Sequence, residues 1–213
     1  MQSVESLSAA DNSVNLLIMP VDVELYRLTA AGPEPQAEWT RTTASYLESA
    51  VNRQIQNLGY EVTPGQSAPF SAGSTENQLE RLHEAVGQMI LTHSVTLEAV
   101  PLPTKAGVFD WSLGESARVL AADNNANYAL FVYFRDSFST GGRIAMQIAA
   151  AAVAGVVIPG GQQAAFASLV DLDTGDIVWF NFALSTQGDS REIEGVEGAV
   201  EELLESFPRN TQS

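Results

Sequence analysis

The sequence predicts an α/β protein in which a mixed β-sheet carries packed helices and ends in a β-hairpin and a C-terminal helix. Apolar or alternating segments predict strands, and apolar residues spaced three and four apart predict helices. The two kinds of segment alternate along the chain, which is typical of a mixed sheet with helices packed on it. With 213 residues, the chain is long enough for one domain with a full core.

The first strong segment, residues 15–29, begins as an apolar run and then alternates. Pro20 lies in its middle, and because proline cannot donate to a ladder, we expect a bulge or a change of pairing there. Residues 30–38 are predicted to form a loop. Residues 39–58 have helical periodicity. We expect this helix to pack against the sheet through Trp39, Tyr46, Val51, Ile55 and Leu58.

A short strand is expected at residues 60–63, and a second helix from Ser74, whose hydroxyl can cap it, to about Ser94. A third, shorter helix is predicted over residues 113–123. The apolar face of the second helix would consist of Leu79, Leu82, Val86, Met89 and Ile90.

Residues 128–136 are rich in aromatic and β-branched side chains and continuously apolar, which predicts a central strand covered on both faces. Two further strands, at residues 165–172 and 177–184, flank a short polar segment and predict a hairpin. Residues 192–207 have an apolar stripe typical of a last helix, which Pro208 ends.

We predict three parts of the chain from these patterns. Residues 1–13 would be a flexible polar tether, and residues 14–207 a single α/β domain with an apolar insert at 141–161. Residues 208–213 would be a C-terminal tail.

Composition argues against several function classes. Acidic residues outnumber basic ones 26 to 10, and the formal charge of -16 repels phosphate backbones, so no nucleic-acid partner is expected. The chain contains no cysteine, so it has no disulfide, thiolate metal site or cysteine nucleophile. No glycine-rich phosphate loop or serine nucleophile elbow is present, and we expect no cofactor.

Asp173-Thr174-Gly175 matches the triplet that carries the catalytic carboxylate of aspartic proteases, where two such residues share a proton. Only one triplet occurs here, and its place between two strands favours a β-turn. The enzymatic alternative is a hydrolase that uses Asp171, Asp173 or Asp176.

Two histidines, His83 and His93, lie ten residues apart on different faces of the second helix and cannot chelate one ion together. Glu80 and Glu84 flank His83, but the zinc-protease pattern requires a second histidine at the position of Gly87. We therefore predict no metal site and interpret these side chains as solvated polar groups.

The segment at 144–158 is free of charge and rich in alanine, with glycine pairs on both sides. Its length fits a buried helix or an interfacial element better than a membrane span. A buried core helix is one interpretation, and a contact element for a partner protein, another copy of the chain or a membrane is the other. The predicted contact residues are Ile144, Ile148, Ala151, Val153 and Val157.

The strand at 15–25, the helix after it, the tract at 127–136 and the final hairpin together resemble bacterial envelope lipoproteins of the curli-secretion type. They also resemble the N-terminal domain of TolB and the outer-membrane lipoprotein activators of penicillin-binding proteins. The matching hairpin residues are Asp171, Thr174, Gly175, Ile177, Val178 and Trp179.

The resemblance implies a TolB N-terminal-domain-like fold and a non-catalytic domain that faces the periplasm. It would bind an envelope protein or copies of itself, with possible peripheral membrane contact. Anchoring to the outer membrane would require a lipidated cysteine, which this sequence lacks. A subunit of a secretion or pore assembly that contacts the membrane through 144–158 is the alternative.

Overall fold

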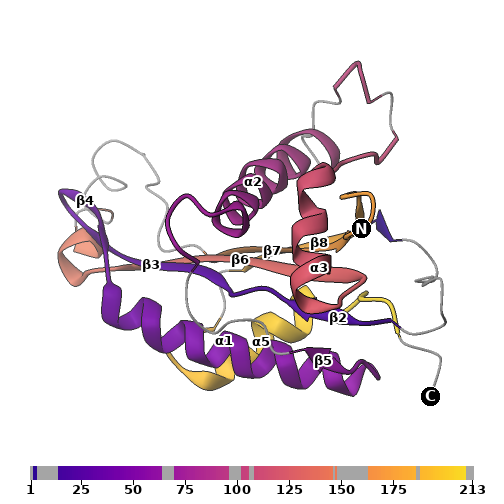
Figure 1. Cartoon of the computed structure of the whole chain (residues 1–213). Coiled ribbons are helices and arrows are strands. Elements are labelled where there is room, and N and C mark those ends of the chain that lie inside the picture. The colour runs from indigo at the N-terminus through magenta and orange to yellow at the C-terminus, as the bar shows by residue number, and fades with distance from the viewer. Residues whose placement is uncertain are drawn as a thin grey trace.

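Helices cover both faces of one mixed β-sheet, as the sequence predicts (Figure 1). The strands are β1 (Gln2–Ser3), β2 (Leu16–Ile18), β3 (Asp22–Thr29), β4 (Gly32–Pro35), β5 (Val62–Thr63), β6 (Tyr128–Ser139), β7 (Gln163–Asp171) and β8 (Ile177–Ser185). The helices are α1 (Ala37–Asn57), α2 (Thr75–Ile90), α3 (Arg118–Asn124) and α5 (Ile193–Leu203). The computed structural model describes residues 2–3, 14–63, 70–95, 102–105, 108–145, 147, 163–185 and 188–209.

Within these residues the strand order is β1-β8-β7-β6-β2-β5, with β3 also beside β6 and β4 beside β3. β6 pairs parallel with β2 and β3 on one side and antiparallel with β7 on the other. Residues 128–134 of β6 are all buried, which confirms the predicted central strand. α2 and α3 lie on one face of the sheet, and α1 and α5 lie on the other (Figure 1).

Pro20 interrupts the first strand segment and shifts its register, as predicted. Ile18 pairs with Leu130 and Asp22 pairs with Tyr133, so residues 19–21 lie opposite only residues 131–132. Because strand side chains alternate between faces, the extra residue reverses the alternation. The apolar side chains of β3 therefore face α1, and its acidic side chains face α2.

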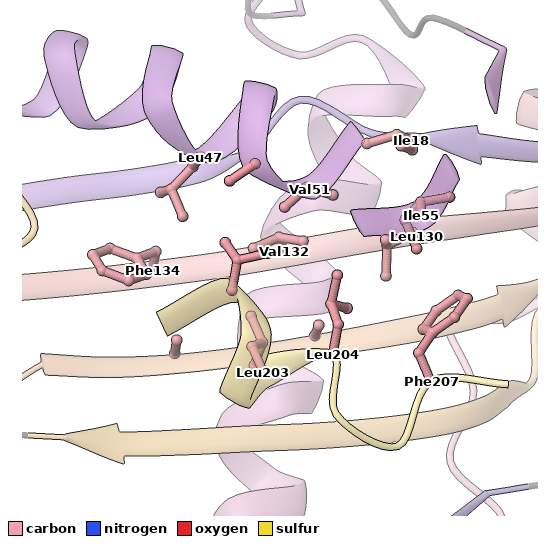
Figure 2. Packing of buried hydrophobic residues seen from close by; sticks show 14 of the residues in the cluster. Ile18, Leu47, Val51, Ile55, Leu130, Val132, Phe134, Leu203, Leu204 and Phe207 are labelled. Atoms are coloured by element: carbon pink, nitrogen blue, oxygen red, sulfur yellow. The ribbon is translucent and has the colours of Figure 1, made fainter. Parts of the chain in front are cut away.

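The core beneath the sheet joins α1, α5 and the even-numbered residues of β6 (Figure 2). Val51 and Ile55 of the predicted α1 face are fully buried, and Trp39, Tyr46 and Leu58 pack at its margin. Trp179 of β8 stacks edge-to-face on Phe207 beyond α5, at 4.9 Å between ring centroids. α1 and α5 contact each other and together cover this face of the sheet (Figure 1).

The predicted apolar face of α2 is partly wrong. Leu79 and Ile90 are buried, but Leu82 is 40% exposed and Met89 is 45% exposed. His83 and Gly87 lie against the sheet instead. A Cβ at Gly87 would lie 2.1 Å from the Phe166 ring, so the absent side chain permits the close approach.

Other boundaries differ in smaller ways. Ser74 caps α2 by accepting from the backbone N–H of Asn77, as predicted. The α-helix itself ends at Ile90, and a π-helical turn, Leu91–Val95, extends it past the predicted end near Ser94. The predicted loop at 30–38 contains β4, an edge strand whose two prolines pair with β3. Leu113 precedes the short 3₁₀ turn that leads into α3.

Near the N-terminus, β1 lies within the predicted tether at 1–13, most of which is outside the described residues. None of the helices in the described ranges is long and apolar enough to cross a bilayer.

Candidate functional site

The aspartates proposed for a hydrolase form a structural turn. The Asp171 carboxylate accepts from the backbone N–H groups of Asp173, at 2.8 Å, and Thr174, at 3.2 Å. Gly175 has φ +81°, and a Cβ there would lie 2.1 Å from the carbonyl oxygen of Gly114. The Asp173 side chain is 91% exposed. This geometry confirms the predicted hairpin turn, and Asp171 stabilises it as a hydrogen-bond acceptor.

His83 is a core residue and not a solvated one, so that part of the interpretation was wrong. It is 2% exposed, its Nε2 lies 2.9 Å from Ser168 Oγ, and its ring stacks on Phe131 at 4.9 Å. Burial lowers the pKa of His83 from 6.5 to about 3, so the ring is neutral. Although a histidine and a serine meet here, both are sealed in the core, and the pair fixes α2 to β7.

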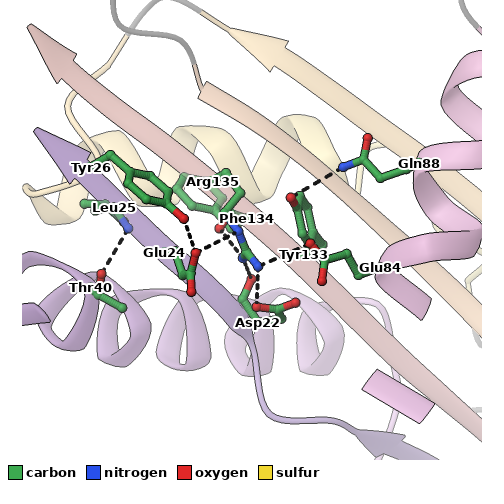
Figure 3. Close-up of polar contacts among 10 residues, drawn as sticks. All are labelled: Asp22, Glu24, Leu25, Tyr26, Thr40, Glu84, Gln88, Tyr133, Phe134 and Arg135. Carbon is green, nitrogen blue, oxygen red and sulfur yellow. Dashed lines mark hydrogen bonds and ion pairs between the residues drawn. The ribbon is translucent and has the colours of Figure 1, made fainter. Parts of the chain in front are cut away.

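A charged cluster joins α2 to β3 and β6 on the other flank of the helix (Figure 3). The Arg135 guanidinium lies 2.8 Å from Asp22, 3.7 Å from Glu24 and 3.8 Å from Glu84, and over the Tyr133 ring at 4.1 Å. Because three carboxylates surround this cation, it cannot serve as an anion site. The cluster orients α2 on the sheet.

Two other ionisable side chains in the cluster have shifted pKa values. The hydrogen bond that Tyr26 donates to Glu24 is the main cause that raises the pKa of Tyr26 to about 12. Burial raises the pKa of Glu80 to about 6, with a smaller contribution from the charge of Asp22 and an opposing hydrogen bond from Asn77. Within the described ranges, no three His, Cys, Asp or Glu side chains could together hold a metal ion.

A second polar cluster is buried on the α1 face. Asp136 accepts from Ser190 Oγ at 2.6 Å and from the Ser137 backbone N–H at 2.6 Å, and Gln163 lies at 3.4 Å. Burial is the main cause that raises the pKa of Asp136, and these hydrogen bonds oppose it. Thr43 of α1 donates to the carbonyl of Ser190 at 2.7 Å. The cluster ties α1, β6, β7 and the segment before α5 together.

The outer edge of β8 differs from these structural clusters because, among the described strands, only β1 pairs with it. β1 pairs only with Trp179 and Phe180, and no described strand lies beside residues 181–185. The nine residues of β8 include no charge and no proline. Charged residues and prolines are the usual protection of an exposed edge against pairing with another chain. This edge can therefore accept a further strand.

On the same face of the sheet as Phe182 of β8, Leu82, Val86 and Met89 form an apolar flank of α2. The charged cluster places the Glu84 and Gln88 flank of α2 toward β3 and β6. At about 100° per residue, Leu82, Val86 and Met89 point to the opposite side, toward β8. Val86 and Phe182 of β8 pack on the same apolar cluster.

Below the edge lies an acidic flank formed by Glu202, near the end of α5, and Glu205, just beyond it. The Asn181 side chain donates to the carbonyls of Glu202, at 3.3 Å, and Leu203, at 2.9 Å. Both carboxylate side chains are exposed. The open edge of β8 thus runs between an apolar flank on one face and an acidic flank on the other.

The predicted contact segment at 144–158 is described only at its start. Residues 141–145 and 147 are helical, and the Ile144 side chain is 46% exposed. Ile148, Ala151, Val153 and Val157 lie outside the described residues. A contact role for this segment stays a prediction. The β8 edge was missed because it depends on strand order, although the charge-free hairpin strand was visible in the sequence.

No protein-family model and no curated protein matches this chain. Among solved structures it is similar to a PelC dodecamer from Paraburkholderia phytofirmans, at 11% identity and TM-score 0.44 over 96% of this chain and 91% of that chain. It is also similar to lipoprotein GNA1162 from Neisseria meningitidis, at 15% identity and TM-score 0.36 over 88% and 94%. The LpoB C-terminal domain from Salmonella enterica matches at 14% identity and TM-score 0.31 over 82% and 84%. The binding site proposed for this chain rests on its own geometry.

Proposed function

We propose that this protein is a non-catalytic domain of the cell envelope that binds an extended segment of a partner protein along the open edge of β8. The observation that carries the proposal is that no described strand pairs with the outer edge of residues 181–185 in β8, a strand without charge or proline. On the face to which Phe182 belongs, Leu82 and Met89 of α2 expose apolar surface. Strand addition combines main-chain hydrogen bonds with contacts from alternate side chains, and β8 offers both.

The structure already contains one example of such pairing. Gln2 and Ser3 lie antiparallel to Phe180 and Trp179, although these segments are far apart in the sequence. The β8 edge therefore accepts extended backbone, and residues 181–185 continue the same edge.

The envelope location is proposed from the resemblance of the final hairpin to envelope lipoproteins. Cell fractionation tests it: we expect the full-length gene product in the periplasmic or outer-membrane fraction. Recovery in the cytosol alone would contradict this location without affecting the proposed binding site.

Strand addition is tested with a synthetic peptide of about ten residues that alternates valine and threonine. Two further forms carry backbone N-methyl groups on alternate residues, one form for each edge of the peptide strand. We expect one methylated form to lose binding and the other to keep it, because an added strand uses a single edge for pairing. Equal binding by all three forms would overturn the proposal.

A pair of variants locates the site. Met89→Asp introduces a charge into the apolar flank of α2, and Ile144→Asp does so on a side chain of nearly equal exposure, 46% against 45%, in the predicted contact segment. We expect Met89→Asp to weaken peptide binding and Ile144→Asp to leave it unchanged. The reverse pattern would move the site to the 144–158 segment.

The exposed Ile144 favours a second candidate function, association of copies of the chain through the 144–158 segment. Light scattering at high protein concentration tests it. If this segment mediates association, Ile144→Asp will lower the mass in solution and Met89→Asp will not. A monomeric wild type would remove this candidate.

A further inference from the structure

We infer that the strand bound by β8 alternates apolar and basic side chains. This inference rests on the proposed function and names the chemistry of the partner. Its basis is the difference between the two faces that border the open edge. Successive side chains of an added strand point to opposite faces of the sheet. Every second side chain of the partner would therefore meet one face, and the side chains between them would meet the other.

One set of side chains would meet the apolar flank of α2. Phe182 points to this face, because its cross-strand partner Phe166 lies beneath Gly87. Leu82 and Met89 expose apolar surface on the same face, where Val86 and Phe182 pack on one cluster. Apolar side chains at every second position of the partner would cover this surface and remove it from water.

The other set would meet the acidic flank of α5. This helix contains four glutamates and no basic residue. Glu197 forms an ion pair with Arg53 of α1, at 2.7 Å, and points away from the β8 edge. No ion pair within the described part of the chain uses Glu202 or Glu205. Lysine or arginine in the partner would complement both carboxylates.

A second copy of the chain fits this edge poorly. Its own β8 has no basic residue, so it offers the acidic flank no complement. Antiparallel pairing of two β8 strands would also place two α5 acidic flanks on one face of the combined sheet, in copies that each carry a formal charge of -16. The charges therefore favour a different, basic chain.

Three peptides that alternate valine with lysine, threonine or glutamate test the inference, with binding followed by fluorescence anisotropy at low and high salt. We expect the lysine peptide to bind about tenfold more tightly than the threonine peptide at low salt, and the glutamate peptide most weakly. The difference should shrink at high salt.

Two variants with equal change in net charge separate a local effect from the overall field of the protein. Glu202→Lys keeps the backbone carbonyl that Asn181 binds but reverses the charge at the edge. Glu38→Lys reverses an exposed charge at the start of α1, a helix that follows the edge strand β4. We expect only Glu202→Lys to abolish the preference for lysine.

The outcomes distinguish the two proposals. Equal binding of all three peptides, still sensitive to N-methylation of one peptide edge, would overturn the basic-partner inference and leave strand addition in place. Equal loss of preference in both variants would also overturn the inference. Failure of every peptide to bind would overturn the proposed function itself.

Discussion

Gly87 of α2 lies directly on the ring of Phe166 in β7. A Cβ on Gly87 would be 2.1 Å from Phe166 Cε2, far inside normal contact distance. Together with the bond between His83 and Ser168, this contact fixes which face of α2 turns inward. It therefore also determines that Leu82 and Met89 remain exposed.

Gly87→Ala should destabilise the protein, although alanine favours helices. The added methyl group would force the helix or the Phe166 ring to move, at a cost of about 1 to 3 kcal/mol. Gly198→Ala in α5 is the matched control, because a Cβ there meets nothing within 4 Å. We expect this control to stabilise by up to about 1 kcal/mol. Urea unfolding measures both, and a neutral Gly87→Ala would show that α2 is placed differently.

The buried His83 should make the protein less stable in acid. The pKa of His83 is about 3 in the folded protein and 6.5 in an unfolded chain. Between pH 3 and 6.5 the unfolded chain therefore binds a proton more readily than the folded protein does. The neutral His83 ring therefore contributes fully to the free energy of unfolding above pH 6.5. This contribution falls as the pH drops toward 3, by up to about 5 kcal/mol.

The double variant His83→Leu/Ser168→Ala isolates this effect, because it removes both hydrogen-bonding partners at once. The difference in unfolding free energy between wild type and variant should change with pH between 6.5 and 3. Parallel stability curves across this range would contradict the buried, neutral histidine.

Asp173→Asn should leave the fold and any partner binding unchanged. The Asp173 side chain is 91% exposed, and asparagine suits a turn as well as aspartate does. We expect the unfolding free energy to stay within about 0.5 kcal/mol of wild type. A peptidase activity in the wild type that this variant loses would restore the hydrolase alternative.

Ile55→Ala should remove part of the core beneath the sheet. Ile55 is fully buried among α1, α5 and β6 (Figure 2), and truncating such a side chain costs about 2 to 5 kcal/mol. The midpoint of denaturant unfolding measures this loss. An unchanged midpoint would mean that α1 does not pack on the sheet through this face.

Local sequence patterns predict the elements better than they predict how one element faces another. The bulge at Pro20 can be predicted locally, because proline lacks the N–H that its own strand needs for pairing. The inward face of α2 was mispredicted because apolar periodicity selects Leu82 and Met89 over His83 and Gly87. His83 and Gly87 face the sheet because they contact Ser168 and Phe166, which lie about 80 residues further along the chain.

The candidate site depends on similar long-range information. The absence of charge and proline in β8 is visible in the sequence, but an open edge follows only from the order of strands in the sheet. The same pattern would be unremarkable in a central strand that other strands cover on both sides. Likewise, the two flanks that border β8 come from helices that precede and follow it in the chain.

Residue-resolved amide hydrogen exchange tests most directly whether β8 has an open edge that binds a strand. In the free protein, we expect the outward-facing amides within residues 181–185 to exchange quickly, while amides between β6 and β7 exchange slowly. Addition of the alternating valine and lysine peptide should slow exchange at those outward-facing amides. Slow exchange there in the free protein, or exchange that the bound peptide leaves unchanged, would contradict the proposal.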